Sequence, residues 1–101
     1  MLEKTIQSKI VAFLKQKHYI VRKLDSSSSV GWPDLIAIAP SGKVYFFEVK
    51  TQTGKLSKLQ TRTLDQLKRN KANAYVVRST KEVEAIITAW PTRRRGFRIF
   101  G

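Results

Sequence analysis

The fold is decided by the stretch GWPDLIAIAPSGKVYFFEVK, residues 31–50. Its second half, residues 44–50, is rich in β-branched and aromatic residues and contains no Gly or Pro, so it is expected to form a strand. Alternate side chains of a strand share a face, which places Glu48 and Lys50 on the same side. Because both faces of this strand are largely apolar, it belongs in the middle of a sheet.

A second strand is expected just before this one, and the two should form a hairpin. Gly31 permits an unusual backbone angle, and Pro33 biases its neighbour Trp32 to an extended conformation. The segment PSGK at 40–43 is a turn signal between two apolar runs. Asp34, at the start of one strand, is therefore expected to lie near Glu48, at the end of its antiparallel neighbour.

Two neighbouring carboxylates repel each other unless a cation lies between them. Hard oxygen ligands of this kind select Mg²⁺ or Mn²⁺ over a softer metal. An isolated Glu48-x-Lys50 triplet is more often a salt bridge where a strand reaches solvent. The prediction of a metal site therefore depends on Asp34 joining Glu48.

The order Pro33-Asp34 followed by Glu48-x-Lys50 resembles the motif of the PD-(D/E)xK nuclease superfamily. The longer string GWPD at 31–34 is similar to the VRR-Nuc branch of that superfamily, the virus-type replication-repair nucleases. These elements are weak singly and specific in combination, because they occur in order and at suitable spacing.

Two further features match the same branch. Glu3-x-x-x-Gln7 opens the first expected helix, and Ser57-x-x-Gln60 opens the helix that follows the hairpin. The resemblance then covers nearly the whole chain, from Glu3 to about residue 87. It implies an α/β fold with a restriction-endonuclease-like αβββαβ(α) core, in which helices flank a mixed β-sheet.

The resemblance also implies a set of metal ligands. Asp34 and Glu48 would hold Mg²⁺ or Mn²⁺, and the carbonyl of Val49 and the carboxylate of Glu3 would complete the protein ligands. Glu3 has a second interpretation, since an acid in the first turn of a helix favours the positive helix N-terminus.

Catalytic roles follow from the same resemblance. Lys50 would orient the attacking water and offset the charge that grows on phosphorus. Gln60 would face the active site and help to position water or phosphate. Ser57 and Gln60 also fit a capping box, which alone explains both residues.

Bulk charge points to a polyanionic partner. Twenty Lys and Arg stand against seven Asp and Glu, which gives a net charge of +13 and a pI near 10.6. Such a balance is typical of proteins that bind phosphate backbones; an anionic membrane surface or solubility alone are the other interpretations. Three of the seven acids are Glu3, Asp34 and Glu48, and collecting scarce carboxylates at one place suits a metal.

The rest of the chain completes the order α-β-β-β-α-β-α. The sequence predicts a helix over 2–17 with Leu2 in its apolar stripe, a strand over 19–24, a strand over 74–78, and a last helix stopped by Pro91. A single domain is expected over 1–90, followed by a basic C-terminal tail over 91–101 that combines three arginines with apolar residues. Absence of cysteine excludes disulfides and thiolate metal sites.

The expected function is a metal-dependent DNA endonuclease acting on branched or duplex DNA. Stand-alone VRR-Nuc domains resemble Holliday-junction resolvases, which implies a homodimer that cuts four-way junctions. The expected location is the cytoplasm of a bacterial or phage-infected cell, without a membrane partner. The alternative is a basic DNA-binding module without catalytic activity, in which the acids and the lysine form only ion pairs.

Overall fold

The computed structural model describes residues 1–24 and 30–94, and of residues 90–94 it describes the backbone only. The elements follow in the order α1 (Glu3–Gln16), β1 (Ile20–Lys23), β2 (Leu35–Ile38), β3 (Val44–Val49), α2 (Lys58–Arg69), β4 (Asn73–Val77) and α3 (Thr80–Arg94). This is the predicted order α-β-β-β-α-β-α.

The strands form one mixed sheet in the order β1-β2-β3-β4. β1, β2 and β3 pair antiparallel, and the predicted hairpin is confirmed by the register, which pairs Leu35 with Phe47 and Ile38 with Val44. β4 lies parallel to β3 and pairs Val77 with Val49. Parallel neighbours require a crossover connection, and α2 supplies it.

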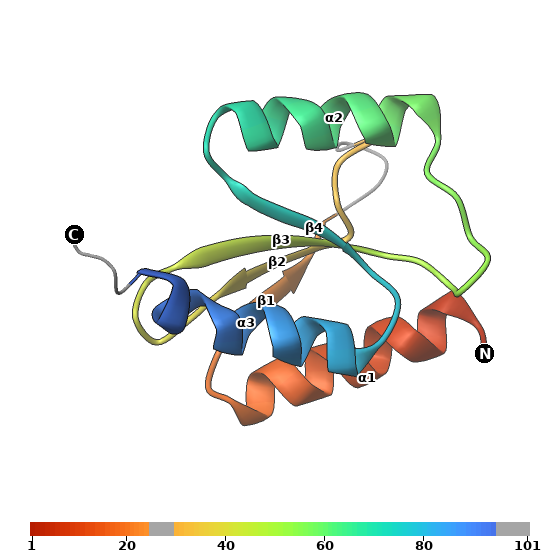
Figure 1. Ribbon diagram of the computed structural model, residues 1–101. Coiled ribbons are helices and arrows are strands. Elements are labelled where there is room, and N and C mark those ends of the chain that lie inside the picture. Colours follow the sequence, from red (N-terminus) through yellow and green to blue (C-terminus); the bar gives the residue numbers. More distant parts are fainter. Residues whose placement is uncertain (25–29, 95–101) are drawn as a thin grey trace.

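Helices cover both faces of this sheet, with α1 and α3 on one side and α2 on the other (Figure 1). On the α1 side, Tyr45, Phe47 and Val49 of β3 join the hydrophobic core formed with Ile10 and Leu14 of α1. The alternate side chains of β3 therefore point toward α2. Sheet alternation thus places Glu48 on the α2 face.

Local chemistry explains where α1 and α2 end. His18, just after α1, has a φ of 69°, and the N–H groups of His18 and Tyr19 donate to the carbonyls of Lys15 and Leu14. That is a Schellman motif, which satisfies the last carbonyls of a helix. Lys71 repeats the motif after α2, with a φ of 68°.

Two predictions about helix ends were wrong. α3 runs through Pro91 to Arg94, because a proline removes only its own N–H and can bend a helix without ending it. Leu2 occupies the N-cap position just before α1 and is 74% exposed, so it does not belong to the apolar stripe of the helix. The buried stripe consists of Ile6, Ile10 and Leu14.

Helix α3 passes the expected domain boundary at residue 90, and residues 95–101 of the basic tail lie outside the described residues. Within 1–24 and 30–94, every helix is too short or too polar to cross a membrane.

Candidate active site

Gly31 brings the segment Trp32-Pro33-Asp34 against α2. Its φ is +83°, and a Cβ atom at this position would lie 2.6 Å from Cγ of Leu59 in α2. A larger residue would meet both the backbone penalty and this close approach. Pro33 is fully buried behind the turn, so Asp34 enters β2 at a fixed place.

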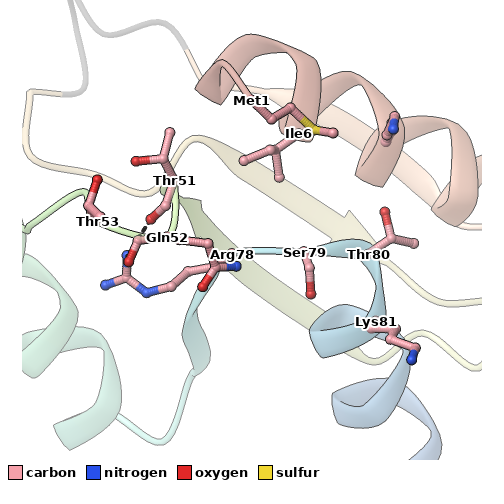
Figure 2. A pocket seen from close by; sticks show the side chains of 10 residues that line it. Met1, Ile6, Thr51, Gln52, Thr53, Arg78, Ser79, Thr80 and Lys81 are labelled. Carbon is pink, nitrogen blue, oxygen red and sulfur yellow. Dashed lines mark hydrogen bonds between the residues drawn. The ribbon is translucent and has the colours of Figure 1, made fainter.

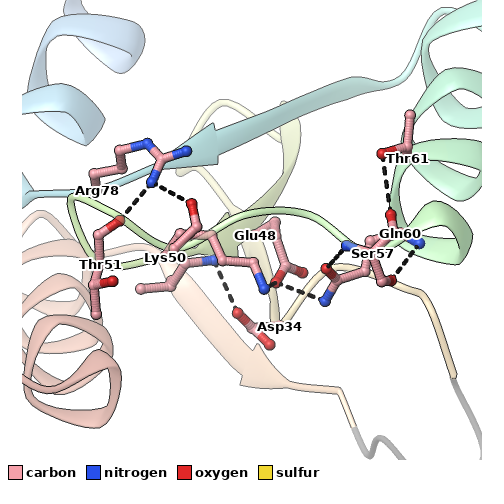
Figure 3. A network of polar contacts seen from close by, with 10 residues as sticks. Asp34, Glu48, Lys50, Thr51, Ser57, Gln60, Thr61 and Arg78 are labelled. Atoms are coloured by element: carbon pink, nitrogen blue, oxygen red, sulfur yellow. Dashed lines mark hydrogen bonds and ion pairs between the residues drawn. The ribbon is translucent and has the colours of Figure 1, made fainter.

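Asp34 and Glu48 meet at one end of the β2–β3 hairpin. Since Leu35 pairs with Phe47, the register brings Asp34 opposite Glu48 at the next position. The backbone N–H of Val49 donates to Oδ2 of Asp34 at 2.8 Å, which fixes this carboxylate at the end of β3 (Figure 3). The predicted approach of the two acids is confirmed.

Glu48 is buried and only partly satisfied. The residue is 1% exposed. Its Oε2 atom accepts a hydrogen bond from Nε2 of Gln60 at 3.1 Å and lies 3.5 Å from Nζ of Lys50. Its other oxygen, Oε1, is buried and has no hydrogen-bond partner among the described residues.

The surroundings of Glu48 disfavour its charged form. Burial and then the nearby Asp34 raise its pKa from 4.5 to about 7, and the charge of Glu3 adds to this rise. Lys50 opposes the rise through its charge and its hydrogen bond. Without a further cation, Glu48 therefore keeps its proton to a higher pH than an ordinary glutamate does.

This donor set fits a hard divalent cation. An unpaired buried carboxylate oxygen costs free energy that a cation can offset, and a second carboxylate lies beside it. Mg²⁺ is commonly bound through one or two carboxylates while it keeps several waters. In the described part of the chain no three His, Cys, Asp or Glu residues gather as a metal cluster. Glu3 is exposed at the start of α1, and its charge contributes to the raised pKa of Glu48. Among the described residues, it does not form a three-residue metal cluster with Asp34 and Glu48.

Gln60 takes part in a capping box and also contacts the buried Glu48, so its two predicted positions are both found. Oγ of Ser57 accepts from the Gln60 N–H at 3.1 Å, and Oε1 of Gln60 accepts from the Ser57 N–H at 2.9 Å, which completes a capping box. Nε2 of the same amide donates to Glu48. The same side chain therefore caps the start of α2 and orients the buried carboxylate of Glu48.

The family model of the VRR-NUC domain matches residues 2–81. The chain belongs to the VRR-NUC domain family. Residues 2–81 contain all the site residues described above, so the family match and the geometry concern the same part of the molecule. The family is one of nuclease-type domains, and the predicted recognition is confirmed.

Solved structures of VRR-NUC domains share the fold. A structure described as "VRR_NUC domain" is 32% identical, with a TM-score of 0.76, over 85% of this chain and 94% of its own. A second, described as "VRR_NUC domain protein", is 16% identical with a TM-score of 0.71, over 88% of this chain and 87% of its own, and it supports the fold alone. Comparison with curated proteins gave no match.

Arg78 is a residue of this VRR-NUC domain that sequence reasoning did not single out. It follows β4, and its Nη1 atom donates to the carbonyl oxygens of Thr51 and, at 2.8 Å, of Gly54. The loop that follows Lys50 is thereby tied to the end of β4. Figure 2 shows the Arg78 side chain turned toward Thr51 and Gln52. The only sequence signal was a basic residue at a strand end.

A hollow of about 750 Å³ lies between this loop, the start of α1 and the start of α3 (Figure 2). Met1 and Ile6 supply an apolar part of its lining, and Lys9 and Lys81 supply positive charge. Neither Asp34 nor Glu48 lines it. It therefore borders the loop after Lys50 without containing the paired acids.

Proposed function

We propose that this chain is a metal-dependent endonuclease that hydrolyses DNA phosphodiester bonds and prefers branched DNA such as four-way junctions. The observation that carries the proposal is the buried Oε1 atom of Glu48, which lies beside Asp34 and has no hydrogen-bond partner within residues 1–24 and 30–94. Lys50 lies 3.5 Å from the other oxygen of Glu48, in a nuclease-type domain, and the chain as a whole has a net charge of +13. A purely structural ion pair would not need the second carboxylate.

Mg²⁺ or Mn²⁺ would be held by the carboxylates of Asp34 and Glu48 and by the backbone carbonyl of Val49, with Glu3 as a further candidate. When bound, the cation supplies Lewis acidity toward the phosphate and toward water. A carboxylate must be deprotonated to act as a ligand. Because the pKa of Glu48 is raised to about 7, binding at neutral pH competes with a proton.

Lys50 would act on the reacting atoms. Its ammonium has three donors, of which one is directed to Glu48. The others can orient the attacking water and offset the negative charge that develops on the phosphate oxygens. Gln60 would act by orienting Glu48 through one N–H of its amide, and the second N–H of Nε2 could contact water or phosphate.

The basic surface would dock the phosphate backbone. Lys55 and Lys58 are exposed and flank Ser57 in the sequence, at the start of the helix whose Gln60 contacts Glu48. Each phosphate neutralised on duplex DNA releases roughly 0.9 counterion. Binding should therefore weaken steeply as salt rises, and a salt-independent affinity would contradict this docking surface.

Cutting two opposing strands of a four-way junction in one encounter calls for two sites. A homodimer about a two-fold axis would hold two copies of the Asp34–Glu48 pair at a fixed separation, so that opposing strands of a junction are cut in one encounter. Light scattering checks this part, since one chain has a mass of 11.6 kDa. A monomer with equal rates on linear and branched DNA would overturn the dimer and leave the nuclease proposal standing.

The deciding experiment is incubation with duplex, single-stranded, flapped and four-way DNA in Mg²⁺, in Mn²⁺ and in EDTA. Cleavage is expected with either cation and not with EDTA, and not with the Glu48→Gln variant. Asp65→Asn is the matched control, because Asp65 is an exposed acid on α2. DNA binding without cleavage under every condition would replace the proposal with the non-catalytic DNA-binding module.

A further inference from the structure

Trp32 is an unusually exposed large aromatic residue close to the proposed metal site. It is 44% exposed. Its ring meets Phe46 edge-on, with the ring centroids 5.9 Å apart and an angle of 67° between the planes. This geometry holds the indole in place while part of its surface stays open to solvent. An anchored, solvent-facing aromatic ring is a suitable platform for stacking.

The indole borders a hollow of about 330 Å³ with the chemistry of a nucleobase site. Its lining consists of Trp32, Thr63, Gln66, Leu67, Arg69 and Asn70. The side-chain amides of Gln66 and Asn70 can both donate and accept, as the edge of a base requires. The guanidinium of Arg69 supplies a positive charge for the phosphate that accompanies the base.

This hollow, which we call the Trp32 hollow, opens on the same face of the sheet as Glu48. Phe46 and Glu48 are two residues apart on β3, so their side chains share the face that points to α2. Trp32 precedes Asp34 by two residues, and two residues of chain span at most about 7 Å. Thr63 of the hollow follows Gln60 by three residues on α2, less than one helical turn, and Gln60 contacts Glu48. The Trp32 hollow therefore begins beside the acids.

The same face continues away from the acids as a second hollow. Phe46, which contacts Trp32, also lines this hollow of about 630 Å³ together with Val44 and Lys71. Lys71 is exposed. Aromatic rings alternating with cations along one groove are the usual means of binding single-stranded DNA.

We propose that the Trp32 hollow binds one unpaired nucleobase of the DNA strand whose phosphate lies at Asp34 and Glu48. This inference rests on the proposed nuclease function and narrows its substrate to strands with an unpaired base beside the cut. A paired base cannot offer a free face to the indole, so intact duplex lacks this contact. Flaps, splayed arms and junction branch points offer it.

The test of the base contact needs no metal and no cleavage. Trp90→Phe leaves Trp32 as the only tryptophan. In EDTA, a single-stranded thymidine oligonucleotide should quench the Trp32 fluorescence saturably, because a stacked base quenches indole emission. An abasic oligonucleotide of equal length and charge should quench little. Equal quenching by the two would overturn the proposal.

Affinities give a second, independent readout. Base–aromatic stacking is worth roughly 5- to 150-fold in affinity per base. Trp32→Leu, which keeps apolar bulk against Phe46, should weaken binding of the thymidine oligonucleotide in that range and leave abasic binding unchanged. Trp32→Phe should keep most of the affinity, and Ile20→Ala, at an exposed residue on the edge strand, should keep all of it. An equal loss for both oligonucleotides would overturn the proposal.

Cleavage then places the base relative to the cut. With Mg²⁺, a flapped substrate should be cut faster than duplex, and Trp32→Leu should reduce that preference. An unchanged preference would overturn the placement of the base beside the cut. If no DNA is cut in any metal, the proposed nuclease function fails, and quenching in EDTA still decides the base site. If Trp32→Leu does not fold, the quenching of Trp90→Phe decides alone.

Discussion

The Nε2 atom of Gln60 donates a hydrogen bond to Oε2 of Glu48 at 3.1 Å, which ties the first turn of α2 to the end of β3. The other end of the same amide accepts from the backbone N–H of Ser57 at 2.9 Å. One side chain therefore begins a helix and orients a buried carboxylate. Its two functions can be separated because they use different atoms.

Gln60→Glu separates these functions. A glutamate can still accept from the Ser57 N–H, so the capping box remains, but it cannot donate to Glu48 and adds a like charge beside it. Cleavage at neutral pH should fall about 10- to 100-fold, as for the loss of other residues that orient a metal ligand. Ser57→Ala is the control, since it weakens the cap and keeps the contact with Glu48. Full activity of Gln60→Glu would show that only the cap matters.

Asp34→Ala and Glu48→Ala should each reduce cleavage to the level of the EDTA control. DNA binding should stay intact or become slightly tighter, because a negative charge near the phosphate is removed. Cleavage assays in Mg²⁺ and Mn²⁺, paired with binding assays in EDTA, measure the two effects separately. Full activity of either variant would contradict the assignment of that residue as a metal ligand.

Lys50→Ala should slow the chemical step by about 100-fold or more while the protein still binds metal. Lys50→Arg should not fully restore the rate, because a guanidinium is a wide fork and an ammonium is a compact charge. Single-turnover kinetics reports the chemical step, and calorimetry with Mn²⁺ reports metal affinity. If metal affinity collapses and turnover of the loaded protein does not, Lys50 is structural.

The raised pKa of Glu48 predicts a pH-dependent stability in EDTA. Between its ordinary value of 4.5 and about 7, the folded protein holds a proton that the unfolded chain has released. The free energy of unfolding should therefore fall as pH rises through this window and then level off. Glu48→Gln cannot ionise, so at pH 8 it should exceed the wild type by up to about 3 kcal/mol.

Urea unfolding at pH 4 and at pH 8 checks this, with Asp65→Asn as the control at an exposed acid. At pH 4 the wild type and Glu48→Gln should be nearly equal. A stability difference of the same size at both pH values would mean that Glu48 does not carry a raised pKa.

The hairpin and its paired acids could be predicted from the sequence because they are encoded locally. The turn at 40–43 sets the register of β2 against β3, and that register alone brings Asp34 to Glu48. The capping box of Ser57 and Gln60 is likewise a pattern within four residues. The family resemblance implies only that Gln60 faces the site. Its contact with Glu48 could not be predicted, because it depends on how α2 lies over the sheet.

The register of the parallel pair β3 and β4 could not be predicted from the sequence. It joins segments separated by a loop and a helix, and no turn fixes how they align. That alignment places Val77 beside Val49, and so Arg78 beside the loop after Lys50. A local rule also failed at Pro91, where α3 continues although proline usually ends a helix.

Arg78 should control the rate without touching metal or DNA at the cut. Its guanidinium holds the carbonyls of Thr51 and Gly54, so Arg78→Ala should loosen the loop after Lys50 and lower kcat by about 10- to 100-fold. Arg78→Lys should recover part of the rate: an ammonium can also donate to more than one carbonyl, but on a flexible stem it holds them less firmly than the guanidinium does. Ser79→Ala is the matched control: it removes the bond from the Glu82 N–H to Oγ of Ser79 at 3.2 Å and costs about 1 kcal/mol of stability without reaching the loop. If Arg78→Ala and Ser79→Ala lose equal stability and slow cleavage equally, Arg78 affects the rate only through the stability of the fold.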